Sequence, residues 1–116
     1  EIKVGKIISA EKIPETDKLL KLSVDFGFKT EDVVKKEEAK TELRETEDIR
    51  QVISGIAPYV AHPQELVGRK FAFVANLEPR TIKGFQSQAM ILATGEGDCF
   101  SLFSPTKDAP SGSLLR

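Results

Sequence analysis

The sequence has very few of the residues that build covalent or metal-based sites. Its 116 residues include one cysteine, one histidine and no tryptophan. A single cysteine excludes an internal disulfide and a cysteine-rich metal site, and it is compatible with a reducing, cytoplasmic compartment. Because Cys99 lies in the apolar stretch 99–103, we expect it to be an inert core thiol. No metal-ligand spacing is present, so we expect no metal and no cofactor.

Long apolar runs are missing as well. No segment approaches the ~20 apolar residues that a membrane-spanning helix needs, and no basic-then-apolar start indicates a signal peptide. The length suits one domain, so we expect a single domain over residues 1–116 and no membrane partner.

The chain also lacks a catalytic constellation. His62 precedes a proline and has no serine or cysteine nucleophile near it in sequence, which favours a surface-turn histidine over a general base. The glycines of segment 95–98 lead into a strand rather than a helix, so they predict a hairpin turn and not a phosphate loop. We therefore expect the domain itself not to be an enzyme.

Neither sign of charge dominates, and the net charge is −1. A strongly basic balance, the usual feature of nucleic-acid binders, is absent. The charges are nevertheless unevenly placed. Segment 29–50 has eight acids and six bases, whereas segment 69–83 has four bases and the single acid Glu78. Any anion-binding face must therefore be local.

The clearest pattern in the chain is an alternation of period two. Apolar residues occupy every second position of 20–28, which predicts a half-buried strand. Residues 2–8 alternate loosely and predict a first strand with Ile2, Val4 and Ile8 on one side. Further strands are expected at 49–56, 71–77, 88–94 and 99–103, with a short helix within 57–67 and an extended tail after Pro105.

Residues 29–48 interrupt this pattern with a charged insertion. Lysine, glutamate, aspartate and threonine dominate it, and its apolar positions make only a ragged helical stripe. We expect either a frayed helix starting after Thr30 or a flexible loop that protrudes from the domain. Five or six short strands with one short helix in the middle predict an all-β fold, and this order fits the five-stranded oligonucleotide-binding barrel, which has a helix between its third and fourth strands. Its ligand-facing loops would be residues 13–18 and 78–87.

The loop at 76–87 is rich in side chains that can bond to RNA. Arg80 and Lys83 supply charge, and Phe85 can stack on an unpaired base while Met90 packs against one. The alternative is a polar surface hairpin with Met90 in the core. From the residues alone the two interpretations have equal weight.

Several blocks of sequence resemble one family when taken in order. They are Val4-Gly5-Lys6-Ile7, Ala10-Glu11-Lys12, Pro14-x-x-Asp17-Lys18-Leu19, Arg50 to Ile56, Ala75-Asn76-Leu77-x-Pro79, and Lys83-Gly84-x-x-Ser87-Gln88-Ala89-Met90. The chain is similar to the tRNA-binding domain found at the C-terminus of bacterial methionyl-tRNA synthetases, in free-standing tRNA-binding proteins and in the endothelial monocyte-activating polypeptide. The resemblance covers most of the chain outside residues 29–48.

The resemblance implies an oligonucleotide-binding barrel that holds tRNA by shape and backbone, pairs as a homodimer, and works beside a synthetase catalytic domain in cis or in trans. The tRNA contacts it implies are Lys18, Arg50, Asn76, Arg80, Lys83, Ser87 and Met90. Three positions depart from the family pattern: Ile13 replaces a histidine, and Glu78 and Thr81 replace lysines, with Arg80 partly restoring the charge. We expect these changes to lower the affinity for tRNA more than they disturb the fold.

Two other functions stay open at this point. The domain could be a dimerisation module of a synthetase whose RNA contacts have weakened, which Glu78 and the acidic insertion favour. It could also be similar to a secretion-chaperone family that shares the barrel and binds peptides. That family usually lacks an insertion such as 29–48.

Overall fold

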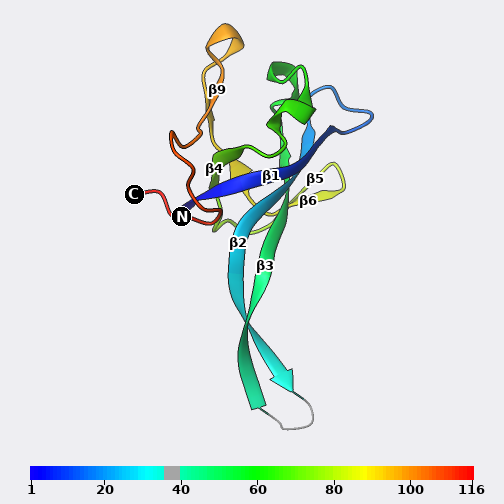
Figure 1. Ribbon diagram of the computed structural model, residues 1–116. Helices are drawn as coiled ribbons and strands as arrows, with labels where there is room; N and C mark the ends of the chain where they lie inside the picture. Colours follow the sequence, from blue (N-terminus) through cyan, green and yellow to red (C-terminus); the bar gives the residue numbers. More distant parts are fainter. Residues whose placement is uncertain (36–39) are drawn as a thin grey trace.

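The computed structural model describes residues 1–35 and 40–116, with the side chains of residues 1–29 and 46–116. Its centre is a curled antiparallel sheet of five strands in the order β3-β2-β1-β4-β7 (Figure 1). These strands are β1 (Ile2–Lys12), β2 (Leu20–Lys35), β3 (Lys40–Ser54), β4 (Lys70–Val74) and β7 (Met90–Ile91). Two small hairpins accompany the sheet: β5 (Arg80–Ile82) with β6 (Phe85–Ser87), and β8 (Ala93–Thr94) with β9 (Ser101–Leu102).

The sheet closes into a barrel through hydrogen bonds between β3 and the chain around β6. Gln88 donates its backbone N–H to the carbonyl of Gln51 (2.8 Å), and the N–H of Gln51 donates to the side-chain oxygen of Gln88 (3.0 Å). The N–H of Ile53 donates to Ser87 Oγ (3.0 Å). A closed sheet leaves fewer unpaired edges, and the predicted oligonucleotide-binding barrel is confirmed.

The alternating residues of β2 build the core as predicted, with one exception. Leu20, Leu22, Val24 and Phe26 are almost fully buried, and Phe26 meets Phe73 edge to face at 5.3 Å. Phe28, which continues the alternation in sequence, is instead 70% exposed. The register of β2 against β3 shifts between Asp25 and Phe28, at Gly27 with φ +86°. The irregularity turns the next side chain away from the core.

The other expected core residues are buried or pack on the core. Phe71, Phe73 and Ile91 belong to the central cluster, and Leu102 is partly buried against it. Val4 is buried too, but the C-terminal segment covers that part of β1. There the N–H of Val4 donates to Ser113 (2.8 Å) and the N–H of Leu115 to Ile2 (2.9 Å).

The face predicted for β1 is wrong at one position. Ile8 is 45% exposed, and its neighbour Ile7 is fully buried. A register shift between Ile7 and Ser9 changes which side chains point inward. Gly5 also lies on the inner face, where a Cβ atom would come within 2.5 Å of Val24 and 2.9 Å of Phe73. Only glycine allows the backbone this close to the core.

The charged insertion is neither a helix nor a loop where the structure describes it. Residues 28–35 of β2 pair with 40–47 of β3, from Phe28↔Glu47 to Lys35↔Lys40. We call this paired segment the arm; it extends away from the barrel (Figure 1). Asp48, placed in the insertion from sequence, is buried and belongs to the barrel. The part of the insertion at 36–39 lies outside the described residues.

The connections contain short 3₁₀ helices. The helix expected within 57–67 is two separate turns, η1 (Ala57–Tyr59) and η2 (Pro63–Leu66), each with a proline at its start. The hairpin expected at 95–98 is present between β8 and β9, with η3 (Gly97–Cys99) at its tip. Cys99 is exposed there, so the prediction of a core thiol was wrong.

Across residues 1–35 and 40–116 the structure shows no helix long and apolar enough to cross a membrane.

Candidate nucleic-acid interface

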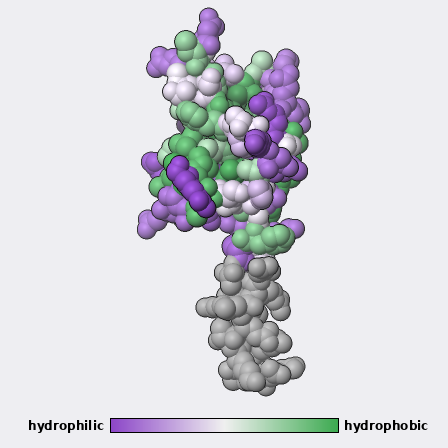
Figure 2. Space-filling view, turned by 60° about the vertical axis from the view of Figure 1, so that its left-hand side comes forward, coloured by the Kyte–Doolittle hydropathy of each residue, from purple (hydrophilic) through white to green (hydrophobic). Residues whose placement is uncertain are grey.

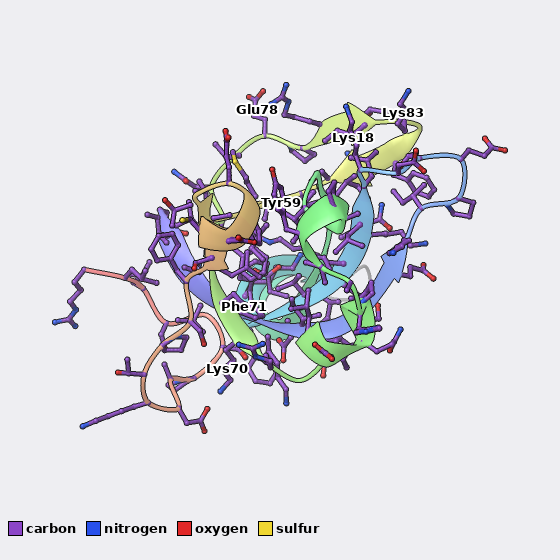
Figure 3. The ribbon with its side chains drawn as sticks, turned by 90° about the horizontal axis from the view of Figure 1, so that it is seen from above. Lys18, Tyr59, Lys70, Phe71, Glu78 and Lys83 are labelled. Atoms are coloured by element: carbon purple, nitrogen blue, oxygen red, sulfur yellow. The ribbon has the colours of Figure 1, made fainter. Side chains whose placement is uncertain are left out.

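Two loops at one edge of the barrel carry exposed cations. Lys18 lies in the loop between β1 and β2, and Lys83 lies at the tip of the β5–β6 hairpin; both point to the same edge in Figure 3. Ile82 pairs with Phe85, so Lys83 and Gly84 form a two-residue turn with φ of +51° and +83°. Positive φ at both positions is typical of a type I′ turn, which holds Lys83 in solvent. We call these two loops the loop face.

Phe85 of this hairpin is not a free stacking platform. Its ring lies 5.4 Å from the Nζ of Lys21, and Lys21 also forms an ion pair with Glu11 at 2.9 Å. The ring is half-buried between these groups. A base that stacks on the face of Phe85 nearest Lys21 would therefore have to displace that ammonium group.

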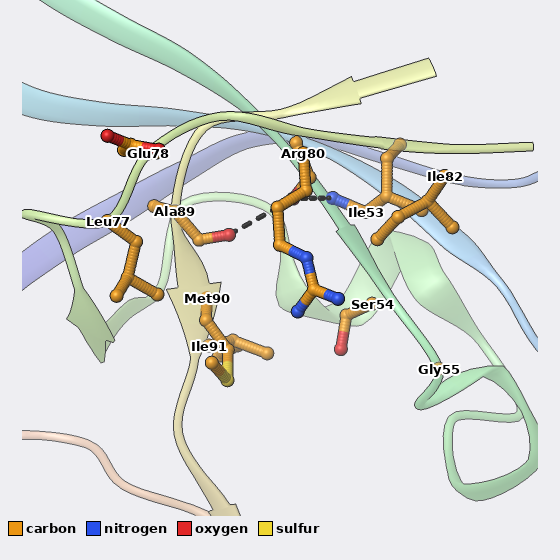
Figure 4. A pocket seen from close by; sticks show the side chains of 11 residues that line it. Ile53, Ser54, Gly55, Leu77, Glu78, Arg80, Ile82, Ala89, Met90 and Ile91 are labelled. Atoms are coloured by element: carbon orange, nitrogen blue, oxygen red, sulfur yellow. Dashed lines mark hydrogen bonds between the residues drawn. The ribbon is translucent and has the colours of Figure 1, made fainter. Parts of the chain in front are cut away.

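A pocket of about 280 Å³ lies beside the hairpin (Figure 4). Its walls are mainly apolar, with Leu77 and Met90 on one side and Ile53 and Ile82 on the other. Met90 is 48% exposed, so the interpretation that placed it in the core is wrong. Arg80 extends into the pocket and Glu78 lies at its rim, as the close-up shows. Apolar walls and one guanidinium offer an unpaired base both a stacking surface and hydrogen-bond donors.

Arg50 has partners inside the protein. Its Nε and one terminal nitrogen donate to the two carboxylate oxygens of Asp48 at 3.0 and 2.9 Å, and the other nitrogen donates to the carbonyl of Ala75. The guanidinium also lies 5.0 Å from the ring centre of Phe26. Such a bidentate pair neutralises the charge of the guanidinium and orients the side chain, so the main role of Arg50 is to stabilise the barrel.

Ser87 is likewise engaged by the fold. Its hydroxyl is buried, accepts the N–H of Ile53 and donates to the carbonyl of Ala89 at 3.1 Å. Both bonds tie β6 to its neighbours. A hydroxyl held in this way has little freedom to bond a ligand.

Asn76 is exposed and lies in a second depression, of about 380 Å³, next to the pocket. Its side-chain oxygen accepts a hydrogen bond from the backbone nitrogen of Glu1 at 2.7 Å. Arg50 lines the same depression, and Leu77 borders both hollows. Leu77 was not among the predicted contacts. The one feature of the sequence that could have indicated Leu77 is that it is an apolar residue within a polar loop.

The predicted contacts thus separate into three groups. Lys18 and Lys83 share the loop face, Arg80 and Met90 share the pocket, and Asn76 shares the neighbouring depression with Arg50. Ser87 also lines the pocket, but its side chain is buried. Across residues 1–35 and 40–116, no group of three or more His, Cys, Asp or Glu side chains could hold a metal.

Comparison with known proteins points to one family. The family model described as a putative tRNA binding domain matches residues 2–45 and 39–114. The chain is 40% identical to a methionine–tRNA ligase of Methanospirillum hungatei over 116 residues, and 41% identical to that of Helicobacter pylori over 115 residues. It covers 14% and 15% of those proteins, so it spans about one seventh of the length of these curated relatives.

Solved structures agree on the fold. A MetRS-related protein of Pyrococcus horikoshii matches with a TM-score of 0.75 and 34% identity, over 99% of this chain and 88% of that protein. The CsaA chaperone of Bacillus anthracis matches with a TM-score of 0.70 and 22% identity, over 99% of this chain and 89% of that chain. At that identity the second match concerns the barrel alone.

Proposed function

We propose, because the chain belongs to the family of putative tRNA-binding domains, that it binds tRNA through its loop face and the adjoining pocket. The family is a binding domain and not a catalytic one. The observation that carries the proposal is the juxtaposition of the exposed Lys18 and Lys83 with a largely apolar pocket containing Arg80 and Met90. The lysines attract phosphates, and the pocket accepts a base.

The binding we propose depends on shape and backbone rather than on a particular sequence. Lysines contact phosphates without discriminating between bases, and the pocket offers apolar contact that any base can use. Glu78 at the rim opposes phosphate, and the net charge of −1 provides no long-range attraction. The affinity should therefore be modest and strongly dependent on salt.

The relatives suggest the setting in which this binding is useful. Methionine–tRNA ligases contain a region like this chain within a much longer polypeptide. We propose that the domain raises the local concentration of tRNA for a synthetase catalytic domain, in cis or in trans. A translation role of this kind belongs to the cytoplasm.

A gel shift with unfractionated tRNA tests the proposal. The wild type should bind, and Lys18→Gln/Lys83→Gln should bind more weakly. The salt slope, meaning the steepness with which the logarithm of the binding constant falls against the logarithm of salt concentration, should be lower by about 1.4–1.8, the value for two lost phosphate contacts. Lys3→Gln/Arg116→Gln, which changes net charge equally away from the loop face, is the matched control. Failure of the wild type to bind tRNA, together with binding to an unfolded client protein, would instead support the chaperone-like alternative.

We also propose that two copies pair through the side of the barrel where the termini lie. Phe103 and Leu115 are about half exposed there and line an apolar hollow of about 260 Å³ with Val4 and Ala72. Figure 2, which brings this side forward, shows apolar surface between hydrophilic side chains. Exposed apolar surface of this kind is typical of contact sites.

A further inference from the structure

A second basic surface lies on the opposite side of the barrel from the loop face. It is an open hollow of about 400 Å³ between β1, the start of β4 and the segment at 104–108. In Figure 3 Lys70 marks this side, and Lys18 and Lys83 lie at the far edge. We call it the basic hollow, and its charged residues are Lys6, Arg69, Lys70, Lys107 and Asp108.

The charges of the basic hollow are unbalanced. Four cations surround one carboxylate, Asp108, which accepts a hydrogen bond from Lys70 Nζ at 2.7 Å. That hydrogen bond, then the charge of Lys70, hold the pKa of Asp108 below its usual value, and Lys6 adds to the effect. Lys70 also donates to the carbonyl of Ala109 at 2.7 Å. One carboxylate is bonded to one lysine, so the hollow keeps a positive excess.

The fold does not explain this concentration of charge. Lys6 of β1 and Lys70 of β4 are direct partners in the antiparallel register. Like charges at directly opposed positions destabilise a sheet. Asp25, the partner of Lys6 on the other neighbouring strand, directs its carboxylate to the backbone N–H of Gly27 (2.8 Å). In a chain with net charge −1, such a cluster indicates an anionic partner.

The uncharged lining suits a phosphate as well. Arg69 is held with its guanidinium 5.0 Å from the ring centre of Phe71, which restricts its orientation. Ser104 and Thr106 contribute exposed hydroxyls to the hollow. Phosphate oxygens accept hydrogen bonds from ammonium, guanidinium and hydroxyl groups alike.

We propose that the basic hollow binds phosphates of the RNA backbone, as a second contact region opposite the loop face. The inference rests on the proposed tRNA binding and extends it to a surface with at least as many cations. RNA then engages two sides of one domain, and the salt dependence of binding reports cations from both.

The test compares charge-matched double variants of the full chain against unfractionated tRNA over a salt series. Lys6→Gln/Lys107→Gln removes two exposed cations and leaves the Lys70–Asp108 pair in place. It should lower the salt slope by about 1.4–1.8 and weaken binding several-fold at low salt. Lys3→Gln/Arg116→Gln should change neither, and thermal melting should show that both variants fold.

The outcomes separate this inference from the proposed function. If the wild type binds tRNA and the Lys18/Lys83 variant weakens it while the Lys6/Lys107 variant does not, the inference is wrong and the loop face stands. If only the Lys6/Lys107 variant weakens binding, the hollow is confirmed and the loop face is not. A wild type that binds no RNA overturns both. Loss of a dimer by the Lys6/Lys107 variant, with tRNA affinity unchanged, would assign the hollow to chain pairing and also overturn the inference.

Discussion

At the scale of single residues, the side chains predicted to contact tRNA divide into those that bond to the protein and those that face solvent. Arg50 and Ser87, although they match positions of the family pattern, make their hydrogen bonds inside the barrel. Sequence cannot make this distinction, because a serine that ties two strands together has the same composition and spacing as one that meets a ligand. Lys18, Arg80, Lys83 and Met90 are exposed, and their contact with tRNA stays a prediction.

Ser87→Ala should therefore affect stability more than binding. The change removes the acceptor of the buried Ile53 N–H, which should lower the free energy of unfolding by about 1–3 kcal/mol. Urea denaturation measures this loss, with Ser101→Ala, at an exposed position of β9, as the control. A tRNA affinity that falls while the unfolding free energy stays at its wild-type value would show that Ser87 acts on RNA after all.

Glu78 gives the sharpest single-residue test of the loop face. It is exposed at the rim of the pocket, where its negative charge would repel a phosphate. Glu78→Lys should raise tRNA affinity at low salt, with a gain that disappears as salt screens the charge. Glu96→Lys makes the same change in net charge at the β8–β9 hairpin. Equal gains from both substitutions, or none from Glu78→Lys, would place the RNA elsewhere.

At the scale of the elements, the alternation of period two was the most informative signal. It located β2 and most of the core, because one buried face and one solvated face impose alternation. The same logic explains the error in the insertion. A strand pair that leaves the barrel has no core to face, so its sequence need not alternate and its strand character was missed. The shifts at Ile8 and Phe28 were missed because a one-residue irregularity leaves no mark in composition.

The arm should be dispensable for the stability of the barrel. Lys29 pairs with Thr46, so an Asn-Gly turn replacing residues 30–45 would close the hairpin at that pair. The charged segment contains too few apolar residues to offset the entropy of ordering it through burial, so the melting temperature should change by only a few degrees. Thermal melting followed by circular dichroism measures the change. A large decrease would show that the arm packs on a second chain.

The boundary of the arm can be checked in the same assay. Asp48 is buried and accepts two hydrogen bonds from Arg50. Asp48→Ala should cost about 3–5 kcal/mol, because it leaves a partly buried guanidinium without its carboxylate. A replacement that extends through Asp48 should therefore destabilise the domain where the 30–45 replacement does not.

At the scale of the whole molecule, the apolar side near the termini leads to the last prediction. Leu114 is 59% exposed, and Phe103 and Leu115 line the hollow above Val4. A homodimer would cover these side chains and would place two loop faces and two basic hollows in one particle. Light scattering at tens of micromolar should give twice the mass of one chain. Phe103→Glu/Leu115→Glu should give a monomer that still melts cooperatively, since neither residue belongs to the central core. Val67→Glu, at an exposed valine after η2, should remain a dimer.

A wild-type monomer mass would contradict the pairing, and a dimer that survives the double substitution would move the interface to another face. If the dimer forms, its loss should also weaken tRNA binding, because two linked sites raise each other's effective concentration.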